Sequence, residues 1–250
     1  MRDIVGQRSG NPVLREATFR GLPATGEVMT IEGTVNRAYV LLLILLAGVA
    51  VTVVSDQRVL PGLIGIGAIG GLVVAIATVI RKQWAPITAP IYALLEGLVV
   101  GGISLIMEDA YPGIVLSAVA LTFGTFFALL TAYRSRLIKA TENFKLGVVA
   151  ATGAIFVVYV AQAVLSLFGA QIGFLHDAIF GAGILGIGVS VVVVIVAALN
   201  LVLDFDFIEQ GAANGAPKYM EWYGAFGLLV TLVWLYLEIL RLLSKLRSRN

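Results

Sequence analysis

Hydrophobic residues are grouped along this chain into long apolar segments that short polar connections separate. Each segment is close to the roughly 20 residues that a helix needs to cross the hydrocarbon core of a bilayer. Helices are favoured inside lipid because they satisfy their own backbone hydrogen bonds. The pattern therefore predicts an all-α polytopic membrane protein, a bundle of seven transmembrane helices over about residues 34–54, 60–80, 86–107, 113–133, 146–168, 178–207 and 219–243.

The connections are short, so we expect one transmembrane domain over residues 34–246, with a tail over residues 1–33 before it and a tail over residues 247–250 after it. Thr30 is placed to cap the first helix, because threonine accepts hydrogen bonds from amides of a first turn. Lys and Arg gather before the first segment and in the second, fourth and sixth connections. Basic residues favour the cytoplasmic side, so the N-terminus and its tail are expected there. The basic C-terminal tail conflicts with this rule. Either the last segment crosses fully or it re-enters and returns, and we favour a full crossing.

Composition supports a membrane protein and narrows its chemistry. Hydrophobic residues make up 59% of the chain and charged residues 13%, against about 45–50% and about 25% in soluble domains. Cysteine is absent, which excludes disulfides, thiolate metal sites and cysteine nucleophiles. No Gly-x-Ser-x-Gly motif occurs. We therefore expect no enzyme activity and no cofactor. The short loops and the absence of cysteine favour a bacterial plasma membrane.

Carboxylates inside the apolar segments are the feature most informative about function. Glu96 interrupts the third segment, Asp204 and Asp206 close the sixth, and Glu238 lies within the seventh. A charge near the bilayer centre costs roughly 2.5–3.5 kcal/mol on insertion scales, so such acids normally face a protein interior or a water-filled path. Handling of protons or ions is therefore the default hypothesis for this protein.

Helical spacing distinguishes the acids of the sixth segment. Asp204 follows Asn200 by one turn and shares its face, whereas Asp206 points roughly 200° away. We expect Asp204 to face the bundle interior, Asp206 to face the loop side or a lipid headgroup, and Glu209 to lie in water. The alternative is that the segment ends at Leu203 and that all these acids are hydrated. Asn200 and Asp206 remain candidates for an ion path or an interhelical hydrogen bond.

Glu238 needs a partner in so apolar a segment, and two are available. Arg241, three residues later, could pair with it on the same helix. The other candidate is a carboxylate of the sixth helix. Two acids in one dry site cannot both ionise cheaply, so such a pair shares a proton and senses pH. When both are ionised, Asp204 and Glu238 would supply the oxygen ligands that calcium prefers.

Two other charged residues each allow two interpretations. Glu96 either hydrogen-bonds to a neighbouring helix or lines an ion path. Arg81, at the end of the second segment, either extends to lipid headgroups or forms a salt bridge with Asp204.

Glycines at four-residue spacing occur in the second and third segments. Such small residues let helix backbones approach closely in membranes. We therefore predict tight helix packing around two pairs, Gly67 with Gly71 and Gly97 with Gly101.

Three stretches of the chain resemble the Bax inhibitor family, also called the transmembrane Bax inhibitor motif family, and its bacterial members in particular. They are IYALLEG at residues 91–97, LNLVLDFDFI at residues 199–208 and WLYLEILRLL at residues 234–243. The resemblance covers about residues 30–246. It implies a seven-helix bundle that leaks calcium down its gradient, gated by an aspartate pair on the last two helices.

The resemblance also implies roles for individual residues. Asp204 matches the sixth-helix aspartate, and Glu238 falls where the family usually has the second aspartate. Arg81 aligns with a basic residue that can latch the sixth-helix aspartate. The longer glutamate side chain and a long sixth connection depart from the family pattern, and both bear on the pH at which gating would occur.

The leading functional hypothesis is therefore a pH-sensitive calcium leak channel, with the lipid bilayer, calcium and protons as partners. A second hypothesis is a regulatory protein that binds a membrane protease or another membrane partner through its tail or its basic loops. An intramembrane aspartyl protease fits less well, because its Gly-x-Gly-Asp motif is absent. A nucleic-acid partner is not expected.

Overall fold

The computed structural model describes residues 26–169 and 173–249. Seven of its helices are long and apolar enough to cross a membrane, which confirms the predicted fold class. They are α1 (Ile31–Val54), α2 (Leu60–Ile80), α3 (Ala85–Ala110), α4 (Ile114–Arg134), α5 (Glu142–Leu167), α7 (Ile184–Ala213) and α8 (Met220–Arg247). Two short helices join them, η2 (Lys82–Trp84) and α6 (Gly173–Phe180).

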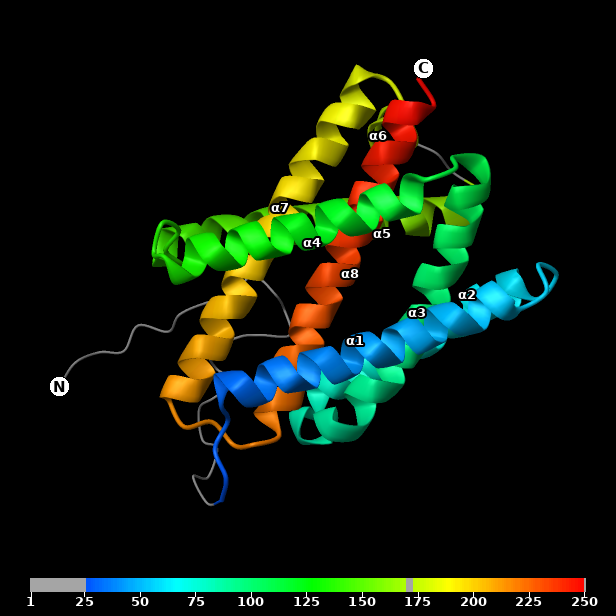
Figure 1. Cartoon of the computed structure of the whole chain (residues 1–250). Coiled ribbons are helices and arrows are strands. Elements are labelled where there is room, and N and C mark those ends of the chain that lie inside the picture. Colours follow the sequence, from blue (N-terminus) through cyan, green and yellow to red (C-terminus); the bar gives the residue numbers. More distant parts are fainter. Residues whose placement is uncertain (1–25, 170–172, 250) are drawn as a thin grey trace.

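The last helix, α8, is the centre of the bundle. It packs against α1, α3, α4 and α7, whereas α2 packs on α3 and α5 packs on α7. Figure 1 shows α7 and α8 running through the molecule with α1 and α4 lying across them. Within its apolar 18-residue stretch, α8 is 61% buried inside the protein, whereas the corresponding stretch of α5 is 11% buried. A side chain on α8 is therefore shielded by protein, while much of α5 is left for lipid.

Capping explains where the first helix begins. Thr30 has extended backbone angles, and its Oγ1 accepts a hydrogen bond from the Gly33 amide at 2.9 Å. This satisfies one of the amides that have no partner within the helix, and it confirms the predicted cap. The helix starts at Ile31, three residues before the predicted span. The first 25 residues of the predicted N-terminal tail lie outside the described residues.

The predicted sixth span is divided in the structure. Helix α6 ends at Phe180 and α7 begins at Ile184, with Gly181 and Gly183 between them. A side chain at Gly181 would approach the Asp177 carbonyl oxygen to 2.5 Å, so the turn depends on glycine. At its other end α7 continues to Ala213, six residues beyond the predicted limit.

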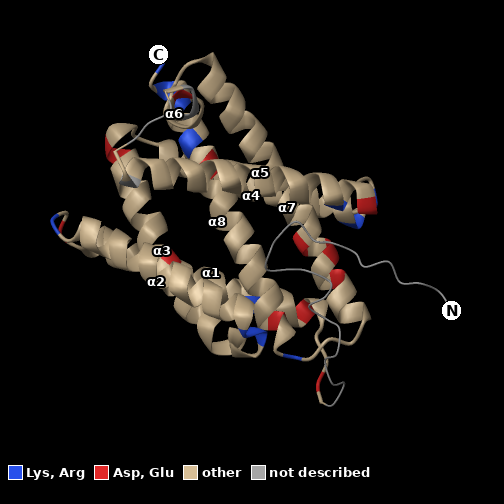
Figure 2. Ribbon diagram, turned by 180° about the vertical axis from the view of Figure 1, so that it is seen from behind, with Lys and Arg blue, Asp and Glu red and all other residues tan. Residues whose placement is uncertain are grey.

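Charged residues gather toward the helix ends, as Figure 2 shows. We call the end at which α1 begins the basic end, because it also holds the α2–α3, α4–α5 and α7–α8 connections with most of the Lys and Arg residues. Helix α8 runs from this end to the opposite one, where Arg247 donates a hydrogen bond to the Pro112 carbonyl at 2.6 Å. The favoured full crossing of the last helix matches this geometry. Which side of a membrane each end faces stays a prediction.

Glycines bring α3 into close contact with its neighbours. A Cβ atom at Gly48 of α1 would lie 2.5 Å from the Leu94 carbonyl oxygen, and one at Gly67 of α2 would lie 2.6 Å from the Leu95 carbonyl oxygen. A Cβ atom at Gly97 would overlap the Leu45 carbonyl oxygen. The predicted role in helix packing is confirmed for Gly67, Gly97 and Gly101, and Gly48 is a further glycine of this kind.

Replacing Gly97 with alanine should therefore destabilise the protein. The added methyl group has no space against α1, and overpacking of this kind costs about 1–3 kcal/mol. Gly153→Ala adds the same methyl group on α5, where nothing lies within 4 Å. It should not destabilise the protein and should stabilise it by up to about 1 kcal/mol, because alanine favours a helix more than glycine does. Thermal unfolding in detergent compares the two. Equal stability of both variants would contradict the account of α1–α3 packing.

Candidate functional site

Asp204 lies deep in the protein, on the face of α7 that the neighbouring helices cover. Its side chain is 0% exposed, between the buried residues Leu203 and Phe205. The predicted interior position is confirmed, and the alternative of a hydrated Asp204 is wrong. Asn200, one turn earlier, is also buried and donates hydrogen bonds at 2.8 Å to Thr152 Oγ1 of α5 and to the Val196 carbonyl. A polar strip therefore lies along the inner face of α7.

Asp206 is 19% exposed and has protein partners that the sequence did not predict. Its carboxylate lies 2.7 Å from Lys145 Nζ, and Gln210 donates a hydrogen bond to it at 2.6 Å. The Lys145 side chain is only 4% exposed and also lies 3.7 Å from Glu142. The start of α5 covers the end of α7, and this supplies a cation that spacing along α7 alone could not reveal.

Glu209 is 37% exposed, which agrees with the expected contact with water, and it has protein partners as well. The Tyr133 hydroxyl donates a hydrogen bond to it, and Arg136 lies 2.8 Å from its other oxygen. These contacts join α7 to the end of α4. The acids after Asp204 therefore fasten helices together at the basic end.

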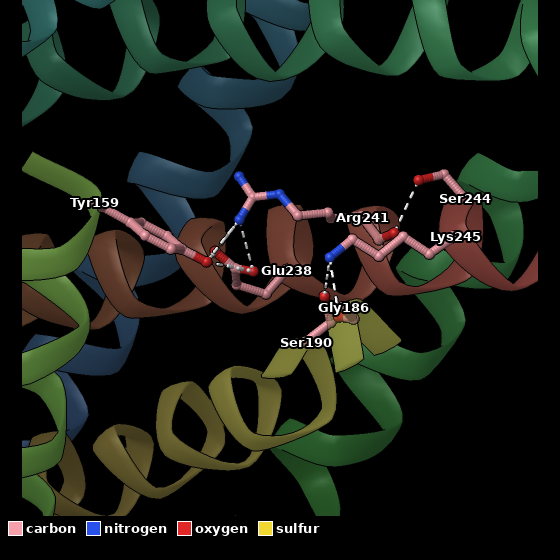
Figure 3. Close-up of polar contacts among 7 residues, drawn as sticks. All are labelled: Tyr159, Gly186, Ser190, Glu238, Arg241, Ser244 and Lys245. Atoms are coloured by element: carbon pink, nitrogen blue, oxygen red, sulfur yellow. Dashed lines mark hydrogen bonds and ion pairs between the residues drawn. The ribbon is translucent and has the colours of Figure 1, made fainter. Parts of the chain in front are cut away.

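Glu238 sits in a second cluster near the other end of α8, with its side chain 2% exposed. Arg241 Nη1 donates hydrogen bonds to both carboxylate oxygens at 2.9 Å. The Tyr159 hydroxyl of α5 donates to the carboxylate at 3.2 Å and accepts from Arg241 at 2.7 Å. Figure 3 shows the three side chains converging. The Arg241 alternative is therefore the one that the structure adopts.

Lys245, one turn after Arg241, reaches Gly186 and Ser190 of α7 (Figure 3). Its buried ammonium donates to the Ser190 hydroxyl at 2.8 Å and to the Gly186 carbonyl at 2.9 Å. These bonds tie the end of α8 to the beginning of α7. They place the Lys245 ammonium beside Ser190. A Cβ atom at Gly224 of α8 would lie 3.3 Å from Ile208 Cγ1 of α7, and the two contacts together define the register of these antiparallel helices.

This register separates Asp204 from Glu238. Asp204 lies 14 residues beyond Ser190, about 21 Å along α7 at 1.5 Å per residue. Glu238 lies seven residues before Lys245, about 10 Å along α8 in the same direction. The two carboxylates therefore differ by about 10 Å along the interface. The shared proton and the gating role of each acid stay predictions.

Glu96 lies between α2 and α3 and does not face the α7–α8 interface. Tyr92, one turn earlier on α3, lies beside it. A Cβ atom at Gly71 of α2 would lie 3.5 Å from its Oε2. The small residue leaves room for the carboxylate within the helix pair. This position fits the interhelical interpretation, and a role in an ion path is untested.

Glu221, at the start of α8, is a buried acid that the sequence analysis missed. Its side chain is 1% exposed and accepts hydrogen bonds from the Thr30 amide at 3.0 Å and the Thr30 hydroxyl at 2.9 Å. Lys218 lies 3.1 Å away and Arg37 lies 4.0 Å away. Gly33 leaves the space that the carboxylate fills. The Lys218–Glu221 spacing was a weak signal, but its partner Thr30 is 191 residues distant in sequence.

Comparison of the chain with models of known protein families identifies its family. A family model described as Bax inhibitor 1 like matches residues 11–248. The chain belongs to the Bax inhibitor 1 like family. This confirms the resemblance carried by the three sequence stretches, while the restriction to bacterial members stays a prediction. No curated protein and no solved structure matches the chain significantly.

The latch that the family resemblance implied for Arg81 is not formed. Arg81 is exposed at the end of α2, and its guanidinium lies over the Trp84 ring, 5.2 Å from the centroid. None of the ion pairs among the described residues involves it. Helix α2 packs on α3 at the periphery, which keeps Arg81 from the buried Asp204. The lipid-headgroup interpretation fits this position.

The calcium ligand set predicted for this Bax inhibitor 1 like protein is not assembled. Within the described ranges, no group of three or more His, Cys, Asp and Glu side chains could hold a metal ion. Asp204 and Glu238 are too far apart along the helices to bind one ion together. A role of these residues toward calcium stays a prediction.

Removing Arg241 should destabilise the protein strongly. Arg241→Gln leaves the buried Glu238 carboxylate without its cation, and breaking a buried ion pair costs about 3–5 kcal/mol. The double variant Glu238→Gln/Arg241→Gln removes both charges and should recover most of the loss.

Thermal unfolding of both variants, with Arg58→Gln in an exposed connection as the control, measures this. A single variant as stable as the double variant would show that the ion pair contributes nothing.

Proposed function

We propose that this protein is a pH-sensitive cation leak with calcium as the permeant ion. The observation that carries the proposal is the burial of Asp204 at 0% and Glu238 at 2% exposure inside adjacent membrane-spanning helices. Acids inside membrane-spanning helices are energetically costly, and those that occur there usually belong to a path for ions or protons. Their position on the two helices that the family resemblance implicates supports the same function.

The two acids act in series along the α7–α8 interface. Asp204 lies nearer the basic end and Glu238 nearer the opposite end, about 10 Å apart along the helices. A cation that has lost part of its water shell can be held by one carboxylate and then by the next. Carboxylate oxygens suit calcium better than softer ions. Two separated single sites also bind more weakly than a shared site, which favours release.

Glu238 is the gate in this arrangement. Arg241 neutralises its carboxylate, and Tyr159 holds both groups from α5. While the Arg241–Glu238 ion pair is formed, the Glu238 carboxylate is neutralised and cannot bind a permeating cation. Opening requires Arg241 to turn away toward the nearby helix end, where it is already partly exposed. Movement of α5, the least buried span, would release Tyr159 at the same time.

Protonation sets the direction of the pH response. Protonating Asp204 removes the negative charge that draws a cation into the interface, so flux falls as pH falls. Deprotonation restores the charge, and flux rises. The response is a consequence of ionisation at a buried site and does not need the two acids to touch.

Calcium flux into liposomes that contain the purified protein, measured from pH 5 to pH 8, tests the proposal. Wild-type flux should increase with pH, and Asp204→Asn should abolish that increase. Glu238→Gln should lower flux at every pH, because the second carboxylate is lost and the Arg241 charge is left unneutralised. Asp109→Asn and Glu32→Gln change exposed acids outside the interface and should behave as wild type.

Flux no greater than in empty liposomes at every pH would contradict the proposal. So would a pH response that survives in Asp204→Asn and Glu238→Gln alike. The first result would leave regulation of a membrane partner as the function to test.

A further inference from the structure

A cavity of about 440 Å³ opens between α1 and α4 at the basic end. Its volume lies within the roughly 300–1,000 Å³ of typical ligand sites. Helices α1 and α4 both pack on α8, and the cavity lies where they diverge. The wall is apolar and is formed by side chains of four helices, among them Val35, Phe126, Leu130, Phe205 and Leu228.

The rim of this cavity is polar and basic. Arg134 and Arg136 stand at it together with Tyr133 and Glu209. Arg136 and Tyr133 are engaged with Glu209. Arg134 is exposed and takes part in none of the ion pairs among the described residues. The rim therefore carries one positive charge in excess, and a guanidinium is left to bind an anion.

Arg136 is held at the rim by an unusual backbone conformation. Its φ angle is 60°, in the left-handed region that non-glycine residues seldom adopt. This conformation turns the chain after α4 so that the Arg136 guanidinium meets Glu209 of α7. Arg134, the last residue of α4, stands beside it at the mouth of the cavity.

We infer that this cavity binds one anionic phospholipid. An acyl chain fits the apolar wall, and the phosphate fits Arg134, because guanidinium groups bind phosphate through paired hydrogen bonds. Arg134 is the last residue of α4 and Ile31 the first of α1, so the rim lies at the depth of lipid headgroups. The cavity opens sideways between two spanning helices, which suits a ligand that arrives through the bilayer.

The site also lies next to the buried acid. Phe205, which lines the cavity, follows Asp204 directly on α7. A bound acyl chain would therefore press on the helix that carries Asp204 and would couple lipid composition to the state of that helix. The binding inference itself does not depend on any leak activity.

Native mass spectrometry of the full chain in detergent tests the site with phosphatidylglycerol and phosphatidylcholine of identical acyl chains. Wild type should retain phosphatidylglycerol preferentially. Arg134→Gln should weaken that binding about fivefold, as expected for one basic residue at a membrane surface, and should leave phosphatidylcholine binding unchanged. Arg58→Gln removes a cation at the opposite end and should change neither lipid.

A second variant tests the apolar wall. Leu130→Trp fills the cavity and should reduce retention of both lipids, whereas Leu116→Trp, on an exposed position of α4, should not. The inference would be overturned if wild type bound both lipids equally. It would also be overturned if neither Arg134→Gln nor Leu130→Trp changed lipid binding. A dimer that Leu130→Trp disrupts while lipid binding persists would also overturn it, because a second copy would then fill the cavity. A free fatty acid that competes as well as phosphatidylglycerol would contradict phosphate recognition.

Discussion

The structure depends on how a membrane bundle accommodates carboxylates in an apolar interior. A buried ionised acid is stable only with a cation or several hydrogen-bond donors around it. Helix α8 meets this constraint near both of its ends. Glu221 accepts hydrogen bonds from Thr30 and lies beside Lys218, and Glu238 is held by Arg241 and Tyr159. The central helix is thus joined to α1 at one end and to α5 at the other.

Close backbone packing and polar fastening have different roles in this bundle. Helices α1, α2 and α3 are brought together by glycines such as Gly48 and Gly97, which let carbonyl groups and neighbouring backbones approach. Helices α4, α5 and α7 are joined at the basic end mainly through charged and hydroxyl side chains, including the Lys145–Asp206 pair. Side-chain fastenings of this kind can be released by protonation or by ligands, whereas the glycine contacts cannot. Movement during a functional cycle would therefore be expected on the α4–α5–α7 side.

Features that depend on residues close together in the sequence were predictable from it. Apolar run lengths located the seven spans, the residue type of Thr30 located a cap, and helical spacing from Asn200 placed Asp204 in the interior. Contacts between distant segments were not predictable. The cation of Asp206, the tyrosine of Glu238 and the acid that meets Thr30 all come from other helices, whose relative placement is set by packing across the whole bundle. The separation of Asp204 from Glu238 along the helices was not predictable for the same reason, since helix register cannot be read from either helix alone.

Water and ion access to the inner face of α7 tests the central claim most directly. The chain contains no cysteine, so Asn200→Cys introduces a single thiol one turn from Asp204. The rate at which a cationic reagent modifies this thiol in liposomes is measured. Dividing it by the rate for Ser248→Cys, an exposed position near the C-terminus, corrects for the pH dependence of thiol ionisation. The account predicts a ratio that rises between pH 5 and pH 8 and no longer rises when Asp204→Asn is added. A thiol at position 200 that stays unmodified at every pH, while the one at position 248 reacts, would contradict it.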